Sequence, residues 1–516
     1  MRFNNALTLR NTSFVQTVKS NRAAFLIIGL ITGLAIIFVT DFSQSFIDGY
    51  FESDIVRNYS VFSVLLFIPG VLAALLILLN PFIGLLIYTL FFLLPPGLPA
   101  GIICFAFTSL VWFIRFLSTQ KSDRKPLVRS PLYLLLIGLY SLGFLVTILV
   151  DGALENFLME PNPTLGVIFY SFSSVVIFNM IDSKEKMNAI IWVAAIVGIS
   201  LGLLCAFQFF SDVPAFFGKG MTRVTTVIDT AEGEYSRAGG TASDGPTTSF
   251  VFISLAFLCL PGVWFEKGKI VKAFFIAAFI IMISGVLFTL SRAGWIAFGL
   301  AYAYWWWKKG RNLKILVISL LIFLILAIPY YDKILDRIYV TYYGLTEEMQ
   351  RPETLIPLAK WKRFFDHPIV GTGFGRVNLF AGTRDYFEEQ GLSYTVDPTA
   401  DENIAEQDAY SQDQSYGTRK IVYIDIGNEI GLLGLLLFFS IIIYTWLNLS
   451  RVERYSKLSA SPYLSNLALG LKTTLVGQGI FCLRNAPSYK VLWFTIGLCW
   501  AISSLLKEES KKGEQE

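Results

Sequence analysis

The sequence has little charge and almost no histidine. Asp, Glu, Lys and Arg make up 16% of its 516 residues, and His367 is the single histidine. A soluble domain carries about 25% charged residues. One imidazole cannot build a metal centre of several histidines, and no spaced carboxylate motif replaces it. These absences argue against a soluble enzyme, and we expect neither a metal nor a cofactor.

Cysteine and nucleotide-binding motifs are scarce as well. No P-loop is present, and the glycines of Gly371–Gly375 do not join a strand to a helix as a dinucleotide site requires. No cysteine is spaced from another as metal ligands are, so we interpret all of them as small buried hydrophobic residues. They are Cys104, Cys205, Cys259, Cys482 and Cys499.

Apolar residues are plentiful and lie in long runs, with a mean hydropathy of +0.58. A membrane-crossing helix needs about 20 apolar residues, and lipid requires that its backbone be paired internally. We therefore predict an all-α polytopic membrane protein with about 12–14 transmembrane helices. The candidate spans are residues 23–40, 61–79, 82–94, 100–117, 131–150, 164–181, 189–210, 248–265, 271–290, 293–307, 315–330, 430–448, 465–483 and 489–506. The third span is short and ends in Pro95-Pro96, so a broken or re-entrant segment is an alternative there.

Basic residues predict the orientation, because lysine and arginine concentrate in cytoplasmic loops. With the N-terminus inside, every strongly basic loop falls on one side, whereas the outside loop 41–60 has four acids against one arginine. No cleavage site of small residues follows the first apolar run, so we interpret it as a retained helix and not as a signal peptide. Both termini are then cytoplasmic.

Two outside segments are too long to be simple connections, because loops beyond about 15 residues are usually functional or disordered. The middle of the longer one, Asp385–Asp413, has nine acids and no base, which is typical of a solvated flap. The predicted organisation is a cytoplasmic segment 1–22, a membrane domain 23–330 of about eleven helices with an outside loop 211–247, a large extracytoplasmic loop 331–429, C-terminal transmembrane helices 430–506 and a cytoplasmic tail 507–516.

Arginine at the membrane boundary marks a candidate site. Arg292 lies between two apolar runs, and the run after it spans only about 22 Å, less than the hydrocarbon core of about 30 Å. Trp305–Lys309 have the character of an anchor at the inner interface, which would hold Arg292 below the outer headgroups. A charge at that depth usually marks a site. The alternative is an arginine that snorkels to lipid phosphate.

A second arginine, Arg237, ends the first outside loop. Pro246 then opens a helix with a polar first turn at residues 247–249. The free N–H groups of a helix N-terminus suit phosphate oxygens, and so does a planar guanidinium. Arg237 and Arg292 both fall outside in the predicted topology, so they can clamp a diphosphate together.

Four stretches, in this order, resemble the O-antigen ligase and polymerase family of bacterial envelope glycosyltransferases. They are Arg237–Phe250 before a proline-led helix, Ser291–Trp295 at a helix junction, His367–Gly375 in the long loop, and Tyr423–Gly434 where that loop leads into a helix. Each motif alone occurs in many proteins, but the four in this order, together with a long outside loop, are specific enough to indicate the family. The family joins sugars carried on a polyprenyl diphosphate to an acceptor, outside the inner membrane and without nucleotide sugars.

The resemblance implies that Arg237 and Arg292 hold the donor diphosphate during catalysis. The family's ligases have a catalytic histidine shortly before the fourth stretch, and Lys420 stands at that position here. This departure favours a polymerase or another exopolysaccharide member over a ligase. We assign Lys420 to catalysis as positive charge for the donor, because a lysine is a poor base unless its pKa is lowered.

A carboxylate near the end of the long loop is then the candidate base. Glu429 is our choice, with an anchor for the helix start as its alternative role. Asp425 lies one helical turn earlier, on the same face if the helix has begun there. We expect substrate-binding roles for Arg419, Tyr423 and Asp425.

The function expected from these residues is glycan transfer or polymerisation in surface or exopolysaccharide assembly. The enzyme would lie in the bacterial inner membrane and work at its outer face. Its partners would be a polyprenyl-diphosphate-linked glycan donor, a glycan or lipid-glycan acceptor and membrane lipids, but no nucleic acid. The alternative is a transporter of bicarbonate or of lipid-linked oligosaccharide. A transporter should carry ionisable residues near the membrane midplane on broken helices, whereas Lys472 and Lys490 lie nearer the ends of their runs.

Overall fold

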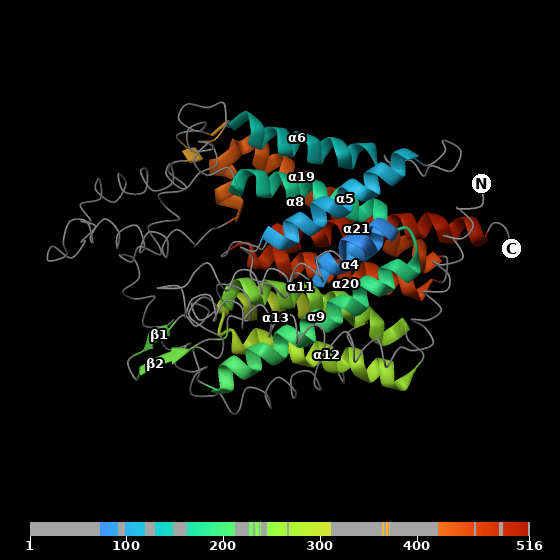
Figure 1. Ribbon diagram of the computed structural model, residues 1–516. Coiled ribbons are helices and arrows are strands. Elements are labelled where there is room, and N and C mark those ends of the chain that lie inside the picture. Colours follow the sequence, from blue (N-terminus) through green and yellow to red (C-terminus); the bar gives the residue numbers. More distant parts are fainter. Residues whose placement is uncertain are drawn as a thin grey trace, which may run out of the picture.

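In the computed structural model, the protein is a bundle of helices with a small hairpin at one end (Figure 1). The structure describes residues 73–90, 99–118, 130–147, 162–211, 227–230, 233–236, 238, 245–265, 268–310, 364–365, 368–369, 371, 422–458, 461–483 and 489–513. The helices are α4 (Pro81–Leu90), α5 (Pro99–Ser118), α6 (Pro131–Thr147), α8 (Asn162–Met180), α9 (Lys184–Ser211), α11 (Gly245–Phe265), α12 (Lys269–Phe288), α13 (Arg292–Lys308), α19 (Val422–Leu458), α20 (Pro462–Phe481) and α21 (Tyr489–Gly513). Strands β1 (Val227–Thr230) and β2 (Gly233–Ser236) pair antiparallel to form the hairpin.

The helices have the length and composition of membrane spans. Among the described residues, four helices are long and apolar enough to cross a membrane, namely Lys184–Phe210, Gly245–Val263, Lys269–Phe288 and Ile426–Lys457. Shorter apolar helices of 10–17 residues accompany them, such as Pro131–Val146. The prediction of an all-α polytopic membrane protein is therefore confirmed. The total number of spans stays a prediction, because the candidate spans 23–40 and 315–330 lie outside the described residues.

Helix α6 illustrates how one helix separates the core from lipid. On one face, Tyr133, Ile137, Tyr140 and Phe144 follow the helical repeat, and each is 0% exposed. The opposite face exposes a row of leucines, namely Leu132, Leu135, Leu139 and Leu142. Such a continuous apolar face is unfavourable in water but suits the hydrocarbon of a membrane.

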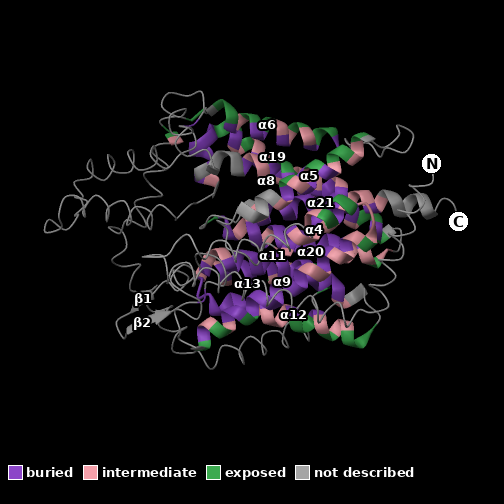
Figure 2. Cartoon of the chain, viewed as in Figure 1, coloured by how far each residue is buried: buried purple, intermediate pink, exposed green. Residues whose placement is uncertain are grey.

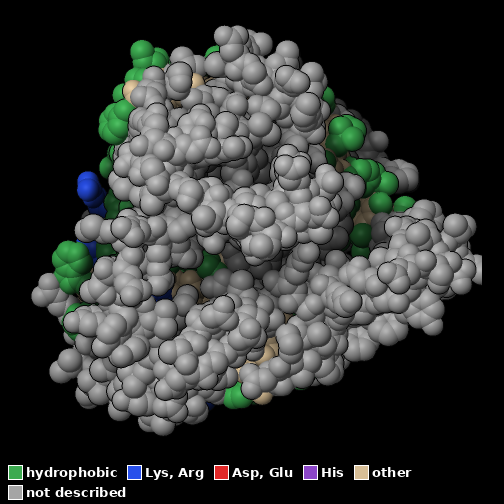
Figure 3. All heavy atoms as spheres, turned by 90° about the vertical axis from the view of Figure 1, so that its left-hand side faces the viewer, with side chains coloured by type: hydrophobic (Ala, Val, Ile, Leu, Met, Phe, Trp, Pro, Cys, Tyr) green, Lys and Arg blue, Asp and Glu red, His purple; other side chains and the backbone are tan. Residues whose placement is uncertain are grey.

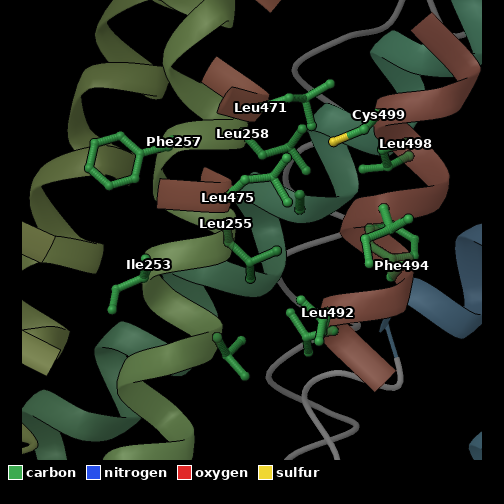
Figure 4. Packing of buried hydrophobic residues seen from close by; sticks show 14 of the residues in the cluster. Ile253, Leu255, Phe257, Leu258, Leu471, Leu475, Leu492, Phe494, Leu498 and Cys499 are labelled. Carbon is green, nitrogen blue, oxygen red and sulfur yellow. The ribbon is translucent and has the colours of Figure 1, made fainter. Parts of the chain in front are cut away.

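The most deeply buried region contains α9, α11, α20 and α21 (Figure 2). Figure 4 shows how apolar side chains of α11, α20 and α21 come together there, among them Leu258, Leu475 and Leu498. Helix α20 packs against α11, α13, α19 and α21. The approach to α11 is close, because a Cβ on Gly470 would lie 2.7 Å from the Phe257 carbonyl oxygen. Small residues allow such helix packing within membranes.

Basic residues gather at one end of the described bundle. At the other end, which we call the loop end, α11, α13, α19 and α21 begin and α12 and α20 finish, near the β1–β2 hairpin (Figure 1, left). The opposite end gathers basic residues, namely Lys184, Lys186, Lys269, Lys272, Lys308, Lys309, Arg451, Arg454 and Lys457. A one-sided distribution of this kind is expected for a cytoplasmic face. Which side of the membrane each end faces stays a prediction.

Several helices extend beyond the apolar runs that predict them. Helix α9 begins at Lys184 rather than at residue 189. Helix α19 begins at Val422, but it is interrupted at Gly431, so residues 422–430 form a short helix that precedes the apolar one. Backbone hydrogen bonding can continue past the hydrocarbon into polar sequence, which an apolar pattern does not detect. The last residues assigned to the large loop are therefore helical. The helix has begun at Asp425, which is the condition for Asp425 and Glu429 to share one helical face.

Candidate functional site

Arg292 is the first residue of α13, directly after a tight turn from α12. In this turn Leu290 has a φ of 48°, a left-handed conformation that is unusual for leucine. Ser291 caps α13, since its Oγ accepts a backbone N–H of the first turn at 3.2 Å. The Trp295 indole N–H donates back to the Val286 carbonyl at 3.1 Å. The turn is thus fixed from both helices, and Arg292 is half-buried where α13 begins.

The start of α11 packs against this turn. The hydroxyl oxygens of Ser249 and Thr289 are 2.6 Å apart. A Cβ on Gly245 would lie 2.7 Å from the Thr289 carbonyl oxygen, and a Cβ on Gly294 would lie 2.6 Å from the Ser249 side chain. Only glycine permits such close approach. The N-termini of α11 and α13 therefore lie side by side at the loop end, each with its N–H groups and positive dipole end.

The segment that follows Arg237 leads to the same turn. Ala238 is buried, and its N–H donates at 3.2 Å to the carbonyl of Phe288, the last residue of α12. Arg237 itself lies outside the described residues. Its partnership with Arg292 on a diphosphate stays a prediction.

Glu429 is buried beside a break in α19. Its side chain is 4% exposed, and the next residue, Ile430, lies near α6, because a Cβ on Gly143 would lie 4.0 Å from its side chain. The helix breaks at Gly431, whose φ of 69° and ψ of −173° are essentially restricted to glycine. Glu429 thus lies inside the bundle and not on the surface of the loop. Whether it serves as the base or as the anchor of the helix stays a prediction.

Tyr423 joins the start of α19 to the end of α20. Its hydroxyl donates to the Gly479 carbonyl at 2.9 Å, and its ring stacks on Phe439 with centroids 5.2 Å apart. Burial raises the pKa of the Tyr423 phenol above its usual value, so the hydroxyl keeps its proton. These contacts are structural, and a further role in substrate binding stays a prediction.

A buried polar cluster connects α20 to α11 and α21. The Gln478 side-chain amide donates to the Ser254 hydroxyl at 2.8 Å and to the Thr495 hydroxyl at 3.0 Å. Both hydroxyls donate in turn to carbonyls of their own helices, at Phe250 and Val491. Gln478 can therefore meet them only with its NH₂ group. Through α20, the helices that carry Arg292 and Glu429 share a common neighbour.

Other expected site residues are not among those that the structure describes. They are Arg419 and Lys420, together with the side chain of Asp425, whose backbone lies in α19.

Lys490 is a loop-end cation to which the sequence assigns no role. It sits at the start of α21, at the end of the bundle where Arg292 lies, and only the antiparallel course of α20 and α21 brings it there. Figure 3 faces this end, where the described side chains in view are mostly hydrophobic and lie along the flanks.

Comparison with known families bears on the same region. A family model described as O-antigen ligase matches residues 277–439. The match begins in α12, includes Arg292 and the long loop, and ends in α19 beyond Glu429, whereas Arg237 lies before it. No curated protein matches the chain. The match covers the helix junction, the long loop and the broken helix. It shows that this part of the chain is similar to the O-antigen ligase family, and it supports a membrane glycan-processing enzyme.

Proposed function

We propose that the protein is a membrane glycosyltransferase of surface or exopolysaccharide assembly, which uses a polyprenyl-diphosphate-linked glycan as donor. The observation that carries this proposal is the junction of α11, α12 and α13. There Ala238 bonds to the end of α12 at 3.2 Å, and two helix N-termini meet beside Arg292. Arg237 directly precedes Ala238 in the sequence. A diphosphate at this junction would meet guanidinium forks and free backbone N–H groups, which both suit phosphate oxygens.

The reaction would be a displacement at the anomeric carbon of the donor sugar. The acceptor hydroxyl forms the new C–O bond, the bond to the diphosphate breaks, and the hydroxyl proton passes to a base. Negative charge grows on the leaving diphosphate, and Arg237, Arg292 and Lys420 would stabilise it because preorganised cations act where charge develops. Glu429 or Asp425 would accept the proton.

Lys420 supports polymerisation, or transfer in exopolysaccharide assembly, over ligation. The ligases of the family carry a histidine at this position, and a lysine beside Arg419 supplies charge better than it removes a proton. Arg419, Tyr423 and Asp425 would contact the sugar or the diphosphate. We place this chemistry at the outer face of the bacterial inner membrane, because the opposite end of the bundle has the basic character of a cytoplasmic face.

Alanine substitution of each arginine tests the donor site. Arg237→Ala and Arg292→Ala should each lower glycan transfer about 30-fold or more, because truncating one partner of a desolvated charge pair costs about 2–5 kcal/mol. Lysine should rescue poorly, because a point charge does not reproduce the bidentate fork. Transfer would be measured in membranes with equal amounts of each variant, using radiolabelled undecaprenyl-diphosphate glycan.

Lys308→Ala, at the opposite end of the bundle, is the control and should transfer glycan at the wild-type rate. If both arginine-to-alanine variants also keep that rate, the diphosphate clamp is wrong. The transporter alternative would then gain, and uptake of bicarbonate or of lipid-linked oligosaccharide would be the next measurement.

A further inference from the structure

A short segment of the long loop lies across the break in α19. In a continuous helix the Leu432 N–H would bond to the Asn428 carbonyl, four residues back. Instead it donates to the Pro368 carbonyl of the loop at 2.7 Å. The break at Gly431 is therefore stabilised by a partner far away in the sequence. We call the described residues Pro368, Ile369 and Gly371 the hook.

The contact between hook and helix is a close approach of two backbones. A Cβ on Gly371 would lie 2.6 Å from both the Asn428 carbonyl oxygen and the Gly431 nitrogen. Gly371 also has a φ of 74°, which side chains rarely adopt. One turn earlier, a Cβ on Gly427 would lie 3.0 Å from the Phe364 ring. Any residue other than glycine at position 371 must lift the hook away from α19.

The peptide held by the hook is the one that carries Glu429. The same Cβ on Gly371 would lie 2.8 Å from the Glu429 carbonyl carbon. The Glu429 side chain is 4% exposed, and α19 packs against α6. Glu429 thus directly precedes Ile430 and the break, at which the Leu432 N–H is bonded by the hook instead of by its own helix.

We propose that the hook is a positioning device for the Glu429 carboxylate, with Gly371 and Gly431 as its positioning residues. This inference rests on the proposed function, in which Glu429 accepts the proton of the acceptor hydroxyl. Docking of the hook keeps α19 broken and aims the carboxylate at the acceptor. Undocking lets α19 straighten and turns Glu429 away, while the diphosphate site at Arg292 remains intact.

Two substitutions undock the hook by different means. Gly371→Ala adds the colliding Cβ. Leu432→Pro removes the N–H that the hook binds, but proline at the first position after the break also prevents α19 from straightening. Turnover in Leu432→Pro should therefore exceed that in Gly371→Ala, because the break persists without the hook. Gly310→Ala is the matched control, because Gly310 also has a positive φ, 106°, but no atom lies within 4 Å of its Cβ. Each variant would be made alone and combined with Glu429→Gln in the full-length protein.

Hydrogen exchange of the peptide 431–436 and glycan transfer from radiolabelled undecaprenyl-diphosphate glycan would be measured for every variant. We expect several-fold faster or slower exchange of this peptide in Gly371→Ala than in Gly310→Ala. We also expect roughly tenfold lower turnover with an unchanged KM for the donor. The Glu429→Gln background should abolish the additional loss, because both changes then act on the same group.

Wild-type turnover in Gly371→Ala would overturn the inference, and so would losses that multiply with that of Glu429→Gln. If Glu429→Gln alone transfers at the wild-type rate while Arg292→Ala does not, the inference is wrong but the donor site of the proposed function stands. If Arg292→Ala is fully active while the hook variants and Glu429→Gln lose turnover together, the hook stands and the donor clamp falls.

Discussion

Replacing Glu453 should destabilise the protein far more than replacing Lys472, although the two form one ion pair. The Lys472 Nζ on α20 is 2.7 Å from the Glu453 Oε2 on α19 and 5.3 Å from the Trp446 ring centroid. Lys472 is 6% exposed and Glu453 16%. Glu453 also pairs with Lys457 one turn along α19, at 2.8 Å, and Lys457 is 64% exposed. Glu453→Gln therefore removes the carboxylate from a buried ammonium, whereas Lys472→Met leaves the carboxylate with a second lysine.

The magnitudes follow from this difference in burial. Removing one partner of a buried ion pair costs about 3–5 kcal/mol. At about 2 °C per kcal/mol for a large chain, Glu453→Gln should lower the melting temperature by about 6–10 °C. Lys472→Met should cost about 1 kcal/mol or less, because Glu453 keeps an exposed partner and some contact with solvent. The double variant should be near the wild type, since replacing both members of a buried pair is often neutral.

Thermal denaturation of the detergent-purified variants would give this order, with the loss of the monodisperse peak in size-exclusion chromatography as the signal. Lys457→Met is the control and should shift the midpoint by about 1 °C or less. The reasoning is refuted if Lys472→Met is as damaging as Glu453→Gln, or if the double variant is worse than both. The same variants separate the two functional classes. A transporter that uses the Lys472 charge loses activity in the double variant, whereas a glycosyltransferase at the loop end keeps it.

Two further substitutions probe the loop end. Gly294→Ala should lower glycan transfer about tenfold or more, because its Cβ would press on Ser249 at 2.6 Å and displace the start of α13. Gly299→Ala, whose Cβ meets nothing within 4 Å, should transfer normally, and equal rates in the two would contradict the close approach. Tyr423→Phe loses the hydrogen bond to Gly479 and should cost about 1 kcal/mol of stability in the same thermal assay, with transfer retained. Lost transfer at unchanged stability would instead mean that the hydroxyl acts on substrate.

The membrane class and most helix positions follow from the apolar runs, because each span obeys its own length and polarity rule independently of its neighbours. The start of α13 at Arg292 and the proline-led start of α11 are predictable in this way. Helix ends that extend into polar sequence, such as the start of α9 at Lys184, are not predictable from the apolar runs. Nor is the short helix before the break at Gly431 in α19. The family resemblance could be recognised from short motifs in order, and the match over residues 277–439 confirms it.

Contacts between segments far apart in the chain depend on the tertiary structure alone. In the sequence, Lys472 is a single charge within an apolar run. Only the packing of α19 against α20 places Glu453 beside it. From the sequence alone, Gly371 is an ordinary loop glycine, and Gly431 is a glycine that lowers the stability of an apolar helix. Only their mutual approach explains both, because the absence of a side chain matters only where another backbone fills the space. Periodicity and composition predict which residues of a segment face solvent, lipid or the protein core. They do not predict which distant segment packs against it, and the break beside Glu429 depends on that.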